Sequence, residues 1–200
     1  MYIESIDKIT KIKYKVSTDK GLLYLYTGDL RRYRLKSGEE VPDEVYDALM
    51  KETLIPRCRK KALDILTRAD RTRKELVNRL KRAGFTEELI DDAIAYVDKY
   101  HYINDERVAA SYIAFKGGRK SSRELTSVLK NKGVDKETAE RLIEAYGDDD
   151  EAIEAAIRKK TLGKTVLSDD ELRKLNAYLF RHGFDGELIR DKLAKFRENV

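Results

Sequence analysis

The stretch RKELVNRLKRAGFTEELIDDAI, residues 73–94, decides the fold, because its pattern returns twice along the chain. Glycine followed by an apolar residue stands at Gly84-Phe85 and recurs at intervals of 49 and 50 residues, at Gly133-Val134 and Gly183-Phe184. Leucines lie four and eight residues before each glycine, a spacing that places them on one helix face. Glycine suits the end of a helix, because it adopts positive φ without a steric clash. We therefore predict a helical repeat protein.

The alignment continues beyond each glycine, where a further amphipathic helix is expected. Candidate capping residues come first, at Thr86, Asp135 and Asp185. Two apolar positions follow, occupied in turn by Ile90, Ala139 and Ile189 and by Ile94, Ile143 and Leu193. Each repeat is read as three helices, expected near 57–68, 72–83 and 87–100, then 105–116, 122–132 and 136–146, then 149–160, 169–182 and 186–197. Such units bury their apolar faces by packing against neighbours, so we expect an elongated, curved array.

The first part of the chain has a different pattern. Alternating apolar residues over 12–16, a turn, and a second apolar run over 22–26 predict a β-hairpin. Residues 30–35 are expected to continue into a third strand. A helix is expected to start near Pro42, and Pro56 is read as the boundary with the repeats, because proline fits the first turn of a helix.

The predicted fold class is mainly α, with a small N-terminal β-hairpin or meander module. The expected domains are a β-meander plus helix at 1–53 and three-helix repeats at 54–103, 104–147 and 148–200. The 40% of charged residues, against about 25% in an average domain, indicate much solvated helix surface. The single cysteine, Cys58, excludes a disulfide within one chain. Cys58 could be a reactive thiol or an inert side chain, and the absence of a nearby histidine favours the inert side chain.

The charge of the chain is distributed unevenly. Residues 54–86 carry eleven Lys and Arg against three acids, whereas residues 87–103 carry five acids against one lysine. The second repeat follows the same order, with six cations against one acid over 116–132. Residues 148–200, by contrast, hold eleven cations and twelve acids. Ordinary solvated surface explains any single cation, but a dense run creates a field that attracts phosphates or an acidic protein surface.

Few residues suggest catalysis or metal binding. The two histidines, His101 and His182, occupy unrelated positions, and no dinucleotide fingerprint or P-loop is present. The acids at 148–151 are better explained by the helix dipole than by a cation, and Gly117-Gly118 by a connector than by a phosphate loop. We expect no catalytic residue, metal or cofactor. Without an apolar leader or a long apolar run, the expected location is the cytoplasm.

Three motifs, taken together, resemble the RecX family of RecA recombinase regulators. They are Arg73-Lys74-Glu75-Leu76…Leu80…Gly84-Phe85, Tyr102-Ile103-Asn104-Asp105-Glu106-Arg107-Val108-Ala109, and Arg123-Glu124-Leu125…Leu129…Lys132-Gly133-Val134. The resemblance covers residues 57–147 well and the third repeat more loosely. In the middle motif, Ile103, Val108 and Tyr112 are expected to form an inward stripe. His101 stands where the family often has glycine.

The resemblance implies a non-enzymatic regulator, and we expect it to be a monomer. It implies binding in the groove of a RecA filament on DNA and inhibition of filament assembly, strand exchange and ATPase in DNA repair and the SOS response. Weak non-specific DNA binding would accompany this role, and no membrane partner is expected. Two alternatives stay open: a direct DNA-binding protein of helix-turn-helix-like modules, and a scaffold for another acidic protein.

The surface expected to face the partner is basic. Its candidate residues are Lys60, Lys61, Arg71, Arg73, Lys74, Arg79, Lys81, Arg82, Arg119, Lys120, Arg123, Lys130, Lys132 and Arg173. The sequence leaves open whether they contact recombinase or DNA phosphate.

Overall fold

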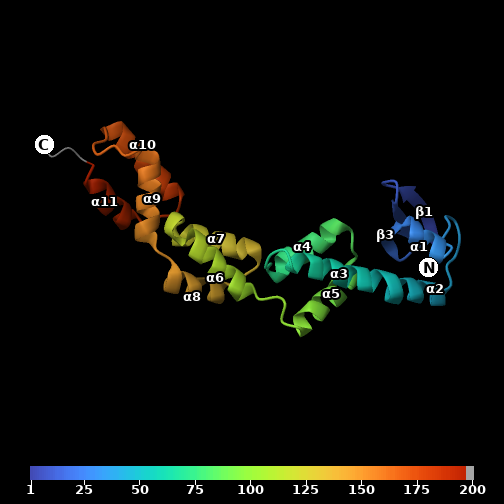
Figure 1. The fold of residues 1–200 in the computed structure, drawn as a ribbon. Helices are drawn as coiled ribbons and strands as arrows, with labels where there is room; N and C mark the ends of the chain where they lie inside the picture. Colours follow the sequence, from blue (N-terminus) through green and yellow to red (C-terminus); the bar gives the residue numbers. More distant parts are fainter. Residues whose placement is uncertain (197–200) are drawn as a thin grey trace. The chain divides into compact units, whose positions relative to one another are not determined.

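A computed structural model describes residues 1–196 of the protein, which is mostly helical with a small N-terminal sheet (Figure 1). The chain divides into two compact units, Met1–Asn104 and Asp105–Val200. Within the described residues, no helix combines the length and apolar character needed to cross a bilayer.

The N-terminal unit contains both the β-rich module and the first repeat. Its elements are β1 (Ile3–Lys8), β2 (Lys13–Thr18), β3 (Gly21–Tyr26), α1 (Thr27–Arg32), α2 (Asp43–Ala48), the π-helix η1 (Leu49–Leu54), α3 (Ile55–Leu66), α4 (Arg73–Ala83) and α5 (Glu87–Lys99). The sheet is antiparallel in the order β1-β2-β3, and it lies beside the helical run from α2 to α3 (Figure 1).

The expected hairpin of 12–16 and 22–26 is confirmed as β2 and β3, but the third strand predicted over 30–35 is wrong. Residues 27–32 form α1, and the third strand of the sheet is β1, which precedes the hairpin. Leu30 and Tyr33 are spaced by three residues and pack together on the core, as helical geometry requires. The Asp29 carboxylate accepts the Tyr26 N–H at 2.8 Å and so supports the start of this helix.

Pro56 does not break the helical path at the entry to the first repeat. The π-helix η1 runs directly from α2 into α3, and the Ile55 N–H donates to the Met50 carbonyl five residues back. Proline within a helix lacks a donor and clashes with the carbonyl four residues earlier. The wider π turn immediately before Pro56 accommodates the ring, so the helix continues where a new start was expected.

One hydrophobic core spans the whole N-terminal unit. Leu25 of the sheet, Leu49 of η1, Cys58 of α3 and Leu80 of α4 belong to one buried cluster. The expected start of a separate repeat near residue 54 therefore falls inside a shared core.

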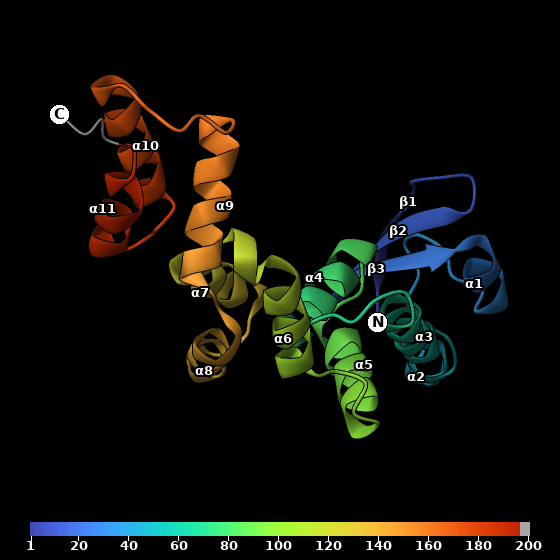
Figure 2. The same cartoon turned by 60° about the vertical axis from the view of Figure 1, so that its left-hand side comes forward.

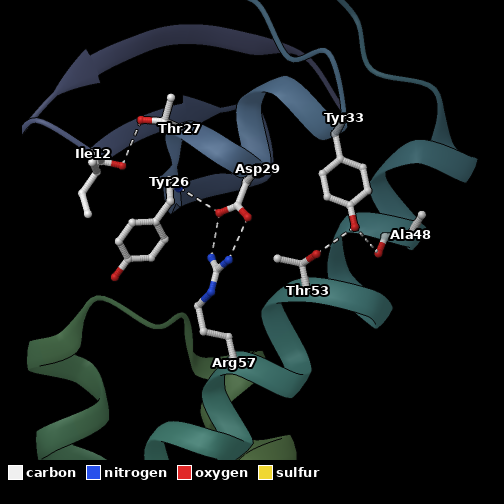
Figure 3. Close-up of polar contacts among 8 residues, drawn as sticks. All are labelled: Ile12, Tyr26, Thr27, Asp29, Tyr33, Ala48, Thr53 and Arg57. Atoms are coloured by element: carbon white, nitrogen blue, oxygen red, sulfur yellow. Dashed lines mark hydrogen bonds and ion pairs between the residues drawn. The ribbon is translucent and has the colours of Figure 1, made fainter.

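An ion pair fixes α1 to α3 (Figure 3). The Arg57 guanidinium donates two hydrogen bonds to the Asp29 carboxylate, at 2.7 and 2.8 Å, and lies 4.9 Å from the centre of the Tyr26 ring. The side chains of Asp29 and Arg57 are 11% and 28% exposed. Tyr33 adds a second link, because its hydroxyl lies 2.8 Å from the Thr53 hydroxyl and 3.3 Å from the Ala48 carbonyl (Figure 3).

The C-terminal unit holds the other two repeats. Its elements are α6 (Asp105–Lys116), the 3-10 helix η2 (Gly117–Arg119), α7 (Ser122–Lys132), α8 (Lys136–Tyr146), α9 (Asp149–Thr161), α10 (Asp169–Arg181) and α11 (Gly186–Ala194). One buried cluster belongs to α6–α8 and another to α9–α11, and Figure 2 shows α10 and α11 side by side next to α9. In the last repeat, the helix predicted over 186–197 is observed as α11, which ends three residues early at Ala194. Residue 197 lies outside the described residues.

The repeat pattern read from the sequence is confirmed in detail. All the aligned apolar positions before and after the three glycines are buried: Leu76, Leu80, Ile90, Ile94, Leu125, Leu129, Ala139, Ile143, Leu175, Leu179, Ile189 and Leu193. The glycines have φ of 94°, 91° and 83° at Gly84, Gly133 and Gly183. Of the expected caps, Asp135 and Asp185 accept backbone N–H groups of the next helix, whereas the Thr86 side chain makes no cap hydrogen bond.

The inward stripe predicted around the middle motif is displaced. Ala109 and Ile113 are fully buried on α6, whereas Val108 and Tyr112 are only partly covered. Ile103 packs instead on the core of the N-terminal unit. The nearby His101 has φ 54°, the conformation for which glycine is best suited.

Candidate binding surface for an anionic partner

An open hollow of about 360 Å³ lies between α3 and α4 in the N-terminal unit. Five cations line it, together with Asp64, Ile65 and Ala83: Lys61, Arg68, Arg71, Arg79 and Arg82. Four of the five belong to the predicted basic surface. The prediction omitted Arg68, although this residue lies in the same basic run at the end of α3.

Helix periodicity brings these side chains together. Lys61 lies on α3 and Arg68 lies in the turn two residues beyond the end of α3, whereas Arg79 and Arg82 are three residues apart on α4 and so share a helix face. Arg71 comes from the connector, which turns sharply because Thr72 caps α4 by accepting the Glu75 N–H. Three consecutive segments therefore direct cations into one hollow.

The hollow is strongly electropositive. None of its five cations forms an ion pair with another described residue of the chain, and Asp64 is the only acid in its lining. The Arg71 Nε is buried and has no hydrogen-bond acceptor within residues 1–196. A buried donor without an acceptor is unfavourable, so an anion placed here would gain both charge complementarity and a free N–H.

Other cations of the predicted surface are paired with acids of the chain. Arg73 forms an ion pair with Asp98 of α5, and Lys120 lies 3.8 Å from Glu124. Lys81 donates to Glu87 at 2.7 Å, and this hydrogen bond and charge lower the pKa of the Glu87 carboxyl. These three side chains are partly neutralised in the free protein.

The remaining predicted residues lie outside the hollow. Lys60 and Lys74 are exposed on α3 and α4, the same two helices, and do not line it. In the C-terminal unit, Arg119 lies in η2, Arg123 and Lys130 are exposed on α7, and Arg173 is exposed on α10. The Lys132 ammonium lies 5.6 Å from the centre of the Tyr112 ring. Position on these elements places them at the surface, and their role in binding stays a prediction.

Two further arginines of the basic run bind acids rather than facing a partner. Arg57 pairs with Asp29, and Arg59 makes two hydrogen bonds to Asp92, at 2.6 and 2.8 Å. Fewer of the eleven cations counted in the sequence are therefore available to an anionic partner than their number indicates. Most of the cations of this run that form no ion pair line the α3–α4 hollow.

The surroundings of Cys58 and of the acidic residues 148–151 can be explained by the fold alone. Cys58 is fully buried, and burial, followed by the charge of Asp92, raises the pKa of its thiol to about 12. This environment agrees with the inert side chain expected from the sequence. In the acidic run, Asp148 caps α9 by accepting the Glu151 N–H, while Asp149 accepts the backbone N–H and hydroxyl of Ser122.

Known proteins are similar to this chain in sequence and in fold. Residues 58–96 match the family model described as RecX, first three-helix domain. The regulatory protein RecX of Caldanaerobacter subterraneus subsp. tengcongensis is 29% identical over 185 residues, covering 90% of this chain and 92% of the relative. That of Clostridioides difficile is 24% identical over 188 residues, covering 90% and 88%.

Solved structures agree with the fold. The crystal structure of a regulatory protein RecX aligns with a TM-score of 0.62 at 19% identity, covering 95% of this chain and 98% of the other. RecX from Lactobacillus salivarius aligns with a TM-score of 0.57 at 22% identity, covering 72% and 96%. In its first three-helix domain, in its sequence over most of its length and in its fold, the chain is therefore similar to the RecX family of regulatory proteins.

Proposed function

We propose that this protein regulates the RecA recombinase without catalysing a reaction itself. It binds in the groove of the RecA filament on DNA and limits filament assembly, strand exchange and ATPase activity. Similarity to RecX regulatory proteins supports a regulatory role. The choice of recombinase as the partner comes from the motif resemblance, and cytoplasmic action as a monomer is part of the proposal.

The α3–α4 hollow is the observation that carries the proposed contact. Its five cations form no ion pair with a described residue, and its four guanidinium groups can each form paired hydrogen bonds with a carboxylate or a phosphate. A recombinase filament on DNA offers both kinds of anion. The hollow is therefore the part of the basic surface that we expect to contribute most to binding.

A matched pair of charge variants tests this assignment. Arg79→Gln with Arg82→Gln removes two cations from the hollow, and Lys60→Gln with Lys74→Gln removes two exposed cations of the same two helices that do not line it. Loss of charge-assisted hydrogen bonds worth about 1.5 kcal/mol in total weakens inhibition roughly tenfold in the first variant. The second variant should stay within about twofold of the parent.

The assay measures inhibition of strand exchange and of DNA-dependent ATPase by preassembled RecA filaments, at two salt concentrations. Circular dichroism controls for folding. Equal weakening by the two variants would move the contact to the wider basic surface. No effect of either variant would refute a role for this surface, and parent protein that never affects the filament would refute the recombinase proposal.

Direct DNA binding is the second candidate, favoured by the same guanidinium cluster, which is equally suited to backbone phosphate. Fluorescence anisotropy with bare single- and double-stranded DNA, measured across a salt series, distinguishes direct DNA binding from recombinase binding. Tight binding without recombinase, with an affinity that falls steeply as salt rises, would favour this alternative. Capture experiments that consistently lack recombinase would favour a different acidic protein.

A further inference from the structure

A second hollow, of about 390 Å³, lies between α9 and α10 of the third repeat. It therefore separates the first and second helices of its repeat, as the α3–α4 hollow does. Its lining differs, because it combines four apolar or aromatic side chains with four cations: Leu162, Leu167, Leu175, Tyr178, Lys160, Lys164, Lys174 and Arg181. The near-balanced charge of residues 148–200 conceals this local concentration in the sequence.

Leu162 is the most unusual residue of this hollow. It ends α9 with φ 53°, a conformation that is uncommon for a residue other than glycine, and its surface is 90% exposed. Gly163 follows with φ 84°. The chain therefore adopts an unfavourable backbone conformation that presents a large apolar side chain to solvent, and such outliers are frequent at binding sites.

The apolar part continues beneath Leu162. Leu167 and Leu175 are buried at 7% and 5% exposure, so they form a firm base, and Tyr178 is partly covered. The Lys160 ammonium lies 4.4 Å from the centre of the Tyr178 ring. A bulky apolar side chain of a partner would find contacts on Leu162, the base and this ring.

The rim is positively charged. Lys160 and Arg181 make no ion pair with any described residue, whereas Lys174 lies 2.7 Å from Asp170. Glu171 is the only acid in the lining. Lys164 holds it at 2.6 Å, and together with the Ser168 N–H this hydrogen bond lowers the pKa of the carboxyl to about 2. Two cations therefore remain available for carboxylates of a partner.

We propose that the α9–α10 hollow binds an acidic protein segment that carries a bulky apolar side chain. The apolar side chain contacts Leu162 and Tyr178, and flanking carboxylates pair with Lys160 and Arg181. The mixed lining favours a peptide over nucleic acid, since a phosphate backbone gains nothing from three leucines. This proposal concerns a separate surface and stands independently of the recombinase assignment.

The probe is a fluorescein-labelled peptide of about twelve residues, composed of Glu and Asp with a central Leu-Phe, and binding to the full chain is followed by anisotropy. Leu162→Gly removes the side chain while suiting positive φ, so it should weaken binding roughly tenfold. Leu162→Asn serves as a second variant that tolerates this conformation. The control is Val166→Ser, which removes a 51% exposed apolar residue of the same connector outside the hollow.

The charge arm compares Arg181→Gln with Lys159→Gln, an exposed neighbour outside the lining. We expect roughly fivefold weaker binding for Arg181→Gln and no change for Lys159→Gln. The proposal is overturned if both Leu162 variants bind like Val166→Ser, if Ser-Ser in place of Leu-Phe leaves affinity unchanged, or if the peptide does not bind. Tighter binding of a twelve-nucleotide oligothymidylate, sensitive to Arg181→Gln, would assign the hollow to nucleic acid instead.

Discussion

Breaking the Asp29–Arg57 pair should destabilise the whole N-terminal unit. Asp29→Ala removes two hydrogen bonds from the Arg57 guanidinium and one from the Tyr26 N–H. It also leaves a guanidinium that is only 28% exposed without its counter-ion. Arg57→Met keeps much of the apolar contact of the side chain while removing the charge.

The burial of the Asp29–Arg57 pair sets the expected loss of unfolding free energy. Loss of one partner of a fully buried pair costs about 3–5 kcal/mol, and partial exposure places Asp29→Ala near the lower end, at about 3 kcal/mol. Arg57→Met should cost about 2 kcal/mol, because the Asp29 carboxylate loses its counter-ion but still accepts the hydrogen bond from the Tyr26 N–H. Once either partner is absent, removing the other matters less, so the double variant should also cost about 3 kcal/mol, a coupling of about 2 kcal/mol.

Urea unfolding of the full chain, followed by circular dichroism at fixed salt, measures all four corners of this cycle. The matched control is the cycle of Asp92→Ala and Arg59→Met, a pair with similar hydrogen bonds whose side chains are 31% and 38% exposed. Its coupling should be below about 1 kcal/mol. Additive effects of Asp29→Ala and Arg57→Met, or equal coupling in both cycles, would refute the reasoning.

Three other perturbations test the repeats and their ends. Leu129→Ala, at a fully buried position, should lower the free energy of unfolding by about 2–5 kcal/mol in urea titrations; a loss below about 0.5 kcal/mol would contradict its inward face. Gly84→Ala should lower the melting temperature more than Gly38→Ala, because both have positive φ but only a Cβ at Gly84 meets the Tyr24 ring, at 2.5 Å. The pKa of Glu171 is lowered to about 2, so its contribution to stability is complete above its ordinary pKa near 4.5 and disappears as the pH falls toward 2. Glu171→Gln should flatten the stability–pH curve in that window, and an unchanged curve would exclude this contribution.

The repeats could be predicted from the sequence because their signals are local. Leucines at helical spacing and a glycine with positive φ act within one or two turns, and the buried Leu80 and Leu129 with φ of 94° and 91° at Gly84 and Gly133 match that expectation. The structure of the N-terminal module was harder to predict from the sequence. Its first strand, IESIDK, is mostly polar, and α1 depends on Arg57, which lies 28 residues from Asp29.

The basic surface was predictable only in outline. Counting charges located the run that contains Arg71, Arg79 and Arg82, but not which cations would be neutralised across helices. Arg73, for example, meets Asp98 only after α4 and α5 pack. In the third repeat, the balance of charge over the segment concealed the cations beside Leu162, because helix periodicity separates acids and bases onto different faces.

The division of the chain at Asn104 has a consequence for its synthesis. The three strands among the described residues, and the core that covers their sheet, lie within the first 104 residues, and the later repeats have buried clusters of their own. Domains fold as units, with the N-terminal one first, while the ribosome is still extending the chain. The nascent N-terminal unit can therefore close over its sheet before the last repeats are translated, which shortens the time during which unpaired strands are open to aggregation.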